Sequence, residues 1–119
     1  LASDNRKQVA MRRMVELAYL LREELHRNNI GAFGEILHEN WMLKKSITSG
    51  VSTSTIDDWY NSARLAGASG GKILGAGAGG FLMFFAPADS HESIKAALHM
   101  LRPVPMGFEP LGSRIIFYY

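Results

Sequence analysis

The sequence has 119 residues, of which 47% are hydrophobic and 20% are charged, and it contains no cysteine. This length suits one compact domain rather than two, so we expect residues 1–119 to form a single domain. Without cysteine, this chain can form neither a disulfide scaffold nor a cysteine-ligated zinc or iron–sulfur site. A formal net charge of +2 is too small to indicate by itself a nucleic-acid or membrane partner.

The first half of the chain predicts three helices. Apolar residues at spacings of three and four predict a first helix over about residues 4–28 and a second over about 32–46. A hydroxyl-rich loop follows, and Ser54 with Asp57 has the spacing of a capping box that begins the third helix. The apolar stripe of the first helix is expected to be Met11, Met14, Ala18, Leu21 and Leu25. The third helix should bury Ile56, Trp59, Tyr60 and Ala63.

The second half of the chain changes to strands. A helix that begins at Asp89 or Ser90 separates two pairs of short apolar segments. Neighbouring strands joined by short loops favour antiparallel pairing. The sequence therefore predicts an α+β layer of about four antiparallel strands with helices on one face, after an N-terminal helical segment. The expected strands are 72–74, 81–86, 104–108 and 114–118.

A glycine-rich loop joins the first two predicted strands. Gly75, Gly77 and Gly80 have the spacing of a dinucleotide-binding fingerprint, but that site needs a helix after the loop, and 81–86 has the pattern of a strand. A Walker motif is excluded because Ile73 follows Lys72 where a hydroxyl is required. Two interpretations remain: a wide hairpin turn, or a flat surface whose backbone a ligand or partner domain approaches closely.

Several motifs resemble one enzyme family. Residues 71–81, Gly-Lys-Ile-Leu-Gly-Ala-Gly-Ala-Gly-Gly-Phe, resemble the third, C-terminal motif of the GHMP kinases. The resemblance extends to the branch that phosphorylates D-glycero-D-manno-heptose 7-phosphate, through Leu-His-Glu-Asn-Trp-Met-Leu-Lys-Lys-Ser at 37–46 and further segments at 49–52, 56–57, 108–110 and 112–116. Ala78 departs from the branch, which usually has glycine there.

The resemblance implies a ferredoxin-like α+β fold and one part of an ATP-dependent sugar kinase. The reaction would convert the heptose 7-phosphate to its 1,7-bisphosphate in the cytoplasm. ATP and Mg²⁺ would be held mainly by an N-terminal kinase domain that is absent from this chain, so the fragment alone would be inactive. The implied partners are the sugar phosphate and that N-terminal domain, with neither nucleic acid nor a membrane.

The candidate site residues follow from the same resemblance. The glycine loop is expected to border the substrate. A phosphorylated substrate needs cations or amides, and sugar hydroxyls can bond to Ser49 or Ser52. No catalytic or metal-ligating residue is predicted, and the four histidines are taken as structural. The loop consists of Gly75, Ala76, Gly77, Ala78, Gly79 and Gly80, and the candidate cations are Lys44, Lys45, Lys72 and Arg114.

Two alternatives remain open from the sequence. One is another GHMP kinase, such as a galactose- or fucose-type sugar kinase. The other is a non-catalytic α+β module that binds a ligand or a protein partner. A kinase domain separated from its other half should expose apolar surface near the glycine loop, whereas a stand-alone module should be polar there.

Overall fold

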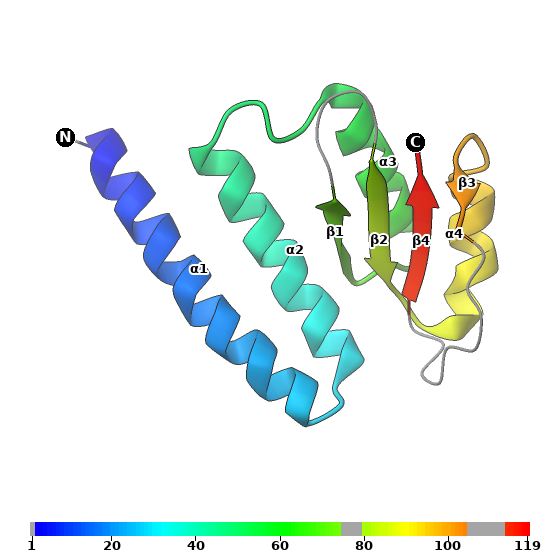
Figure 1. The fold of residues 1–119 in the computed structure, drawn as a ribbon, viewed down its shortest axis with the longest axis horizontal. Helices are drawn as coiled ribbons and strands as arrows, with labels where there is room; N and C mark the ends of the chain where they lie inside the picture. Colours follow the sequence, from blue (N-terminus) through cyan, green and yellow to red (C-terminus); the bar gives the residue numbers. More distant parts are fainter. Residues whose placement is uncertain (1, 75–79, 105–113) are drawn as a thin grey trace.

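The computed structural model describes residues 2–74, 80–104 and 114–119. Within these ranges the chain forms four α-helices, one short 3₁₀ turn and four strands (Figure 1). In chain order these elements are α1 (Ala2–His26), α2 (Ile30–Ile47), α3 (Ser54–Leu65), β1 (Gly70–Leu74), β2 (Phe81–Phe85), η1 (Ala88–Ser90), α4 (His91–Ala97), β3 (Arg102–Pro103) and β4 (Arg114–Tyr118).

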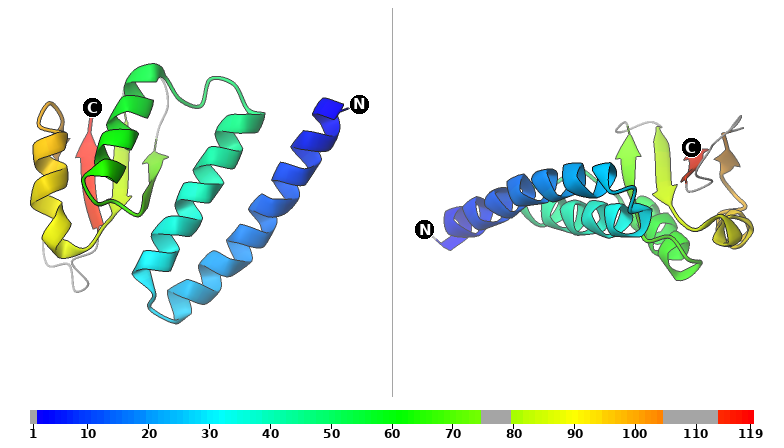
Figure 2. Two further views of the ribbon diagram at one scale, coloured as in Figure 1. Left: turned by 180° about the vertical axis from the view of Figure 1, so that it is seen from behind. Right: turned by 90° about the horizontal axis from the view of Figure 1, so that it is seen from below.

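The strands form one antiparallel sheet in the order β1-β2-β4-β3. Helices α3 and α4 cover one face of this sheet, as the view from below makes clear (Figure 2). Helix α2 runs beside β1 at the edge of the sheet, and α1 lies outside α2 (Figure 1). The predicted α+β layer with an N-terminal helical segment is therefore confirmed.

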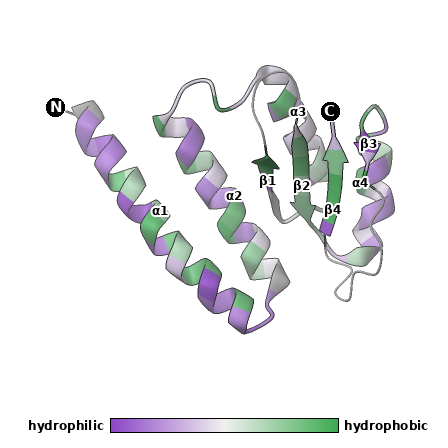
Figure 3. Ribbon diagram, viewed as in Figure 1, coloured by the Kyte–Doolittle hydropathy of each residue, from purple (hydrophilic) through white to green (hydrophobic). Residues whose placement is uncertain are grey.

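Strand pairing gives the sheet a buried face and an open face. Paired residues share a face, so Leu82 and Phe84 of β2 lie with Phe117 and Ile115 of β4 on the side that α3 and α4 cover. These four side chains are buried. The core is completed from the helices by Tyr60, Ala63, Ile94 and Leu98. Hydrophobic residues dominate strands β2 and β4 (Figure 3), including on the open face.

Several boundaries differ from the sequence expectations. Thr53, not Ser54, caps α3, because its side chain accepts the Ile56 amide hydrogen at 3.2 Å. Strand β1 begins two residues earlier than expected, at Gly70. The structure describes strand β3 at Arg102–Pro103, and the Val104 amide donates to the carbonyl of Ile116. The rest of the strand predicted over 104–108 lies outside the described residues.

The covered stripe of α1 agrees only in part with the predicted one, of which Met14 and Leu21 are half-buried. Ala10 and Leu17 are buried, whereas Met11 and Leu25 are exposed. Because α1 packs mainly against α2, only a narrow stripe is covered. Arg13 joins the two helices through Glu39, with Nε 2.6 Å from Oε2. None of the described helices has the length and hydropathy needed to cross a bilayer.

Candidate functional site

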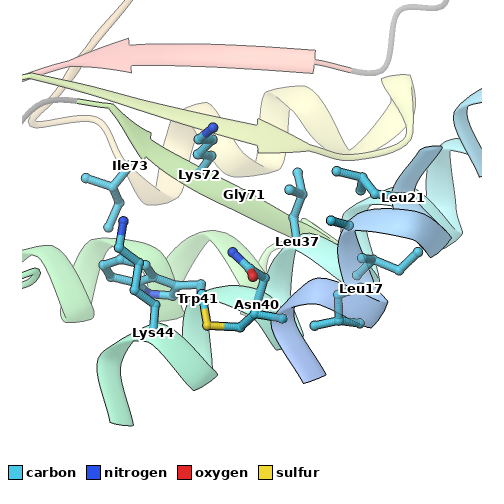
Figure 4. A pocket seen from close by; sticks show the side chains of 12 residues that line it. Leu17, Leu21, Leu37, Asn40, Trp41, Lys44, Gly71, Lys72 and Ile73 are labelled. Atoms are coloured by element: carbon cyan, nitrogen blue, oxygen red, sulfur yellow. The ribbon is translucent and has the colours of Figure 1, made fainter. Parts of the chain in front are cut away.

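A cavity of about 190 Å³ opens between α1, α2 and β1, and we call it the α2–β1 pocket. Its floor is apolar, with Leu17 and Leu21 from α1 among the lining side chains. Its polar side chains are Asn40, Lys44 and Lys72, from α2 and β1. In Figure 4, Asn40 and Lys44 rise from α2 beside Trp41, while Lys72 extends from β1. Every polar side chain in this lining can donate a hydrogen bond, and none is acidic.

The adjacent lysines of α2 have different surroundings. Lys44 lines the α2–β1 pocket, and its side chain has no ion-pair partner among the described residues. Lys45 points toward α3, where its Nζ lies 3.0 Å from Oδ1 of Asp57 and over the ring of Trp41. Successive helical residues point about 100° apart, so this divergence is expected. Of the two, only Lys44 is available to a ligand in this pocket.

Asp57 fixes the loop that follows α2. Its Oδ1 accepts hydrogen bonds from Lys45 at 3.0 Å and from Ser52 at 2.9 Å. Partial burial alone would raise the pKa of Asp57, but these two hydrogen bonds outweigh it and hold the pKa below its ordinary value. Ser49 lines a shallow depression in this loop together with Gly50 and Ser52. Lys45, Ser49 and Ser52 therefore belong to a loop cluster distinct from the α2–β1 pocket.

The free edge of β1 also borders the pocket. Gly80 and Tyr119 exchange backbone hydrogen bonds of 3.3 and 3.1 Å. Since residues along a central strand bond alternately to its two neighbours, the even-numbered residues of β2 bond to β4. The odd-numbered residues of β2 bond to β1, where their partners are Gly70, Lys72 and Leu74. The amides of the intervening residues, Gly71 and Ile73, therefore point away from β2, across the free edge of the sheet. A backbone donor at Ile73 thus adds to the polar side chains of the pocket.

Trp41 lines the pocket but contributes no accessible donor. Its indole Nε1 is sealed from solvent and has no hydrogen-bond partner among the described residues. A ligand in the pocket could reach this atom only if the surrounding side chains moved. Trp41 therefore acts here as an apolar wall.

A second polar group links α2, α3 and β1. His38 Nδ1 lies 2.8 Å from the hydroxyl of Tyr60, and the two rings are stacked. The backbone amide of Gly71 also bonds to that hydroxyl, and burial raises the pKa of Tyr60 to about 12. The Tyr60 hydroxyl has one proton and two lone pairs, so it can accept from the Gly71 amide and still donate to, or accept from, His38 Nδ1. This chain of bonds anchors β1 four residues before Gly75.

His38 should make stability depend on pH. Burial, followed by the charge of Arg64, lowers the pKa of His38 from its ordinary value of 6.5. The folded state therefore favours neutral His38, so its stabilising contribution is complete above pH 6.5 and is lost as the pH falls through the lower folded pKa. We expect the midpoint of urea unfolding to fall between pH 7.5 and pH 5, and this fall to be smaller in His38→Asn, which keeps an acceptor without the titration. An equal fall in both proteins would contradict this assignment.

Helix α2 and β1 approach each other closely through two glycines. A Cβ atom at Gly70 would collide with the backbone carbonyl of Gly34, and one at Gly34 would collide with the side chain of Ser69. Ser69 in turn donates to the carbonyl of Phe85 at 3.0 Å. This contact sets the distance between Asn40 or Lys44 and β1, and so the width of the pocket.

The remaining predicted residues fall into two groups. Residues 75–79 of the glycine loop lie outside the described residues, while Gly80 pairs with Tyr119. Arg114 begins β4 on the open face, opposite Phe85, and lies two strands away from β1. The structure thus brings Lys44 and Lys72 to one pocket and leaves Arg114 elsewhere. In the described ranges, no group of three or more His, Asp or Glu side chains is placed to hold a metal ion.

Sequence reasoning did not single out Asn40, His38 with Tyr60, or the edge amide of Ile73 as parts of one region. Asn40 is four residues before Lys44, so helical spacing could have placed the two on one face. No local signal links His38 to Tyr60 or either to β1, because their contact joins three separate elements.

Comparison with known proteins identifies the family. The family model described as "GHMP kinases C terminal" matches residues 21–102. A D-glycero-alpha-D-manno-heptose 7-phosphate kinase from Campylobacter jejuni is 37% identical over 94 residues, which cover 78% of this chain and 28% of that protein. A mevalonate kinase from Methanothermobacter thermautotrophicus is 44% identical over 73 residues, covering 61% of this chain and 23% of that protein.

The aligned regions thus span about a quarter of the length of these curated relatives. The family match covers α2, α3, β1, β2 and α4, and so includes all elements of the α2–β1 pocket except the first part of α1. This chain therefore belongs to the family of GHMP kinase C-terminal domains.

Proposed function

We propose that this chain is the substrate-side domain of an ATP-dependent kinase that phosphorylates a sugar phosphate, namely D-glycero-D-manno-heptose 7-phosphate, to give the 1,7-bisphosphate. The observation that carries this proposal is the 37% identity, over 78% of the chain, to a heptose 7-phosphate kinase. The cationic lining of the α2–β1 pocket supports it, because this acceptor already carries a phosphate group.

The mevalonate kinase relative also favours an acceptor that carries a negative charge. Mevalonate carries a carboxylate, so both relatives are named for an acceptor with a negative charge. A galactose- or fucose-type acceptor is neutral and would give Lys44 and Lys72 no ionic partner. An anionic acceptor therefore fits this chain better than a neutral sugar.

The open face of the sheet supports a companion domain. Phe81 and Tyr118 are paired across β2 and β4 on this face and remain 46% and 40% exposed. Met83, Ile116 and Leu74 continue the apolar surface beside them, and Lys72 and Arg114 are the charged residues of the three long strands on the same face. A stand-alone module would be expected to carry polar residues here. We assign this face to contact with an N-terminal kinase domain.

In this proposal ATP and Mg²⁺ belong to the N-terminal domain. The described residues contain no group of three or more His, Asp or Glu side chains that could hold Mg²⁺ by themselves. Phosphoryl transfer depends mostly on positioning and electrostatics. The contribution of this chain would be to orient the acceptor and to close the site with the glycine loop. The isolated chain would be inactive, and the complete enzyme would work in the cytoplasm.

The test is ADP release by the full-length protein that carries this chain. We expect D-glycero-D-manno-heptose 7-phosphate to give a kcat/KM at least about 100-fold above that of the same heptose without its phosphate, because charge-assisted hydrogen bonds to the phosphate would be lost. Galactose and mevalonate serve as the neutral and carboxylate comparisons.

Each outcome separates the candidates. Preference for mevalonate would mean that the protein is a kinase but that its acceptor is not a sugar phosphate. Preference for galactose would support the alternative of a kinase for a neutral sugar. A folded full-length protein that binds no ATP would favour the non-catalytic module.

A further inference from the structure

The α2–β1 pocket has the features of a subsite for one end of a small ligand. Ligand pockets commonly enclose about 300–1,000 Å³, and this cavity has about 190 Å³. It is thus too small for a nucleotide or for a whole sugar phosphate. A phosphate or carboxylate group with the carbon next to it is of suitable size.

The residues that line the pocket favour a ligand group with a negative charge. Lys44 comes from α2 and Lys72 from β1, and neither side chain has an ion-pair partner among the described residues. The side-chain amide of Asn40 and the edge amide of Ile73 add donors between them. Acidic side chains are absent from the lining, and the apolar floor strengthens electrostatic attraction by excluding water.

The placement of Lys44 has one simpler explanation. It lies in the last turn of α2, where a cation is stabilised by the helix dipole. Lys45 occupies the same turn, however, and is engaged by Asp57, so the dipole has a cation there without Lys44. A solvent-directed Lys44 would also not need Asn40 and Lys72 around a shared cavity. These contrasts favour a ligand.

We propose that the α2–β1 pocket binds the anionic group that the acceptor carries away from its reacting hydroxyl, with Lys44 and Lys72 as the cations and Asn40 and the Ile73 amide as the neutral donors. This inference rests on the proposed function, and it deepens it by assigning one end of the acceptor to one place.

The test measures binding of the acceptor without ATP, by titration calorimetry on the full-length protein. The probes are D-glycero-D-manno-heptose 7-phosphate, the same heptose without phosphate, and mevalonate. We expect Lys44→Gln to weaken binding of the phosphate ester about 10- to 100-fold, the loss typical of one charge-assisted hydrogen bond. Lys44→Arg should restore most of the affinity, and KM for ATP should be unchanged in both.

Lys95→Gln is the matched control. Lys95 is an exposed lysine of α4 whose Nζ lies 3.5 Å from Glu92, outside the α2–β1 pocket. Its replacement removes the same charge and should change affinity less than twofold. Thermal unfolding of each variant checks that the fold is retained.

The outcomes distinguish this inference from the proposed function. If the protein binds mevalonate instead and Lys44→Gln weakens that binding, the proposed sugar-phosphate acceptor is wrong, but the anion-binding role of the pocket is supported. If Lys44→Gln binds the preferred acceptor as tightly as the unmodified protein does, the anion-binding role of the pocket is wrong, but the proposed kinase function is unaffected. If the preferred acceptor is neutral, or if neither anion binds, the anion site is also wrong.

Discussion

Replacing Gly70 by alanine is expected to lower the free energy of unfolding by about 3 kcal/mol, at the upper end of the usual cost of overpacking. The added methyl group would collide with the carbonyl of Gly34, and the amide of His38 would lie only 3.1 Å from it. Both obstacles are backbone atoms of α2, so no side chain can rotate away. Relief requires α2 and β1 to separate. The measurement is urea unfolding followed by circular dichroism.

Gly31→Ala is the matched control for Gly70→Ala. Gly31 lies in the same helix as Gly34, and a Cβ atom there meets nothing within 4 Å. Its replacement should leave stability unchanged or raise it by up to about 1 kcal/mol, the helix preference of alanine over glycine. If Gly70→Ala were as stable as Gly31→Ala, the close contact between α2 and β1 would be wrong.

Phe84→Ala is expected to lower the free energy of unfolding by about 3 to 5 kcal/mol, the usual cost of truncating a buried phenylalanine. Phe84 is 0% exposed. Its ring lies 5.9 Å from that of Tyr60 and 6.2 Å from that of Phe117, measured between centroids. The cavity left behind would therefore lie between α3 and the sheet. Urea unfolding again gives the measurement.

Phe81→Ala is the control within the same strand. Phe81 lies three residues earlier, on the open face, and is 46% exposed. Its replacement should cost less than about 1 kcal/mol in this chain, because much of the side chain already contacts solvent. In the full-length protein the same substitution should weaken the contact with the N-terminal domain. Equal losses for the two variants in this chain would contradict the assignment of the faces.

The local sequence pattern predicted the structure correctly where the buried residues follow one helical or strand period. In α3, Ile56, Tyr60 and Ala63 recur at helical spacing and are buried as predicted, whereas Trp59 is only partly buried against the core. The continuous apolar run of β2 likewise predicts a strand, whose bounds agree to within one residue. Gly67, which follows the C-cap of α3, has a φ of +123°, a backbone angle that glycine adopts without a Cβ clash. These features depend on neighbours in sequence, so the sequence determined them.

Other features depend on which elements meet. The periodicity of α1 offers several apolar faces, and only its packing against α2 selects Ala10 and Leu17. The sequence made Lys44 and Lys45 equal candidates for binding a ligand. The structure distinguishes them, because Asp57 on α3 forms an ion pair with Lys45. The early start of β1 was also missed, because the pairing of Gly70 with Phe85 of β2 decides where this strand begins.

The sequence by itself determined the family, the order of the elements and the α+β class, since each is encoded in local motifs and hydrophobic periods. Only the tertiary structure decided the α2–β1 pocket. Asn40 and Lys44 come from one helix, whereas Lys72 and the free amide of Ile73 come from a strand nearly thirty residues later. Their proximity depends on the Gly34–Gly70 contact and on the bonds from Tyr60 to His38 and Gly71, and no local pattern encodes these long-range contacts.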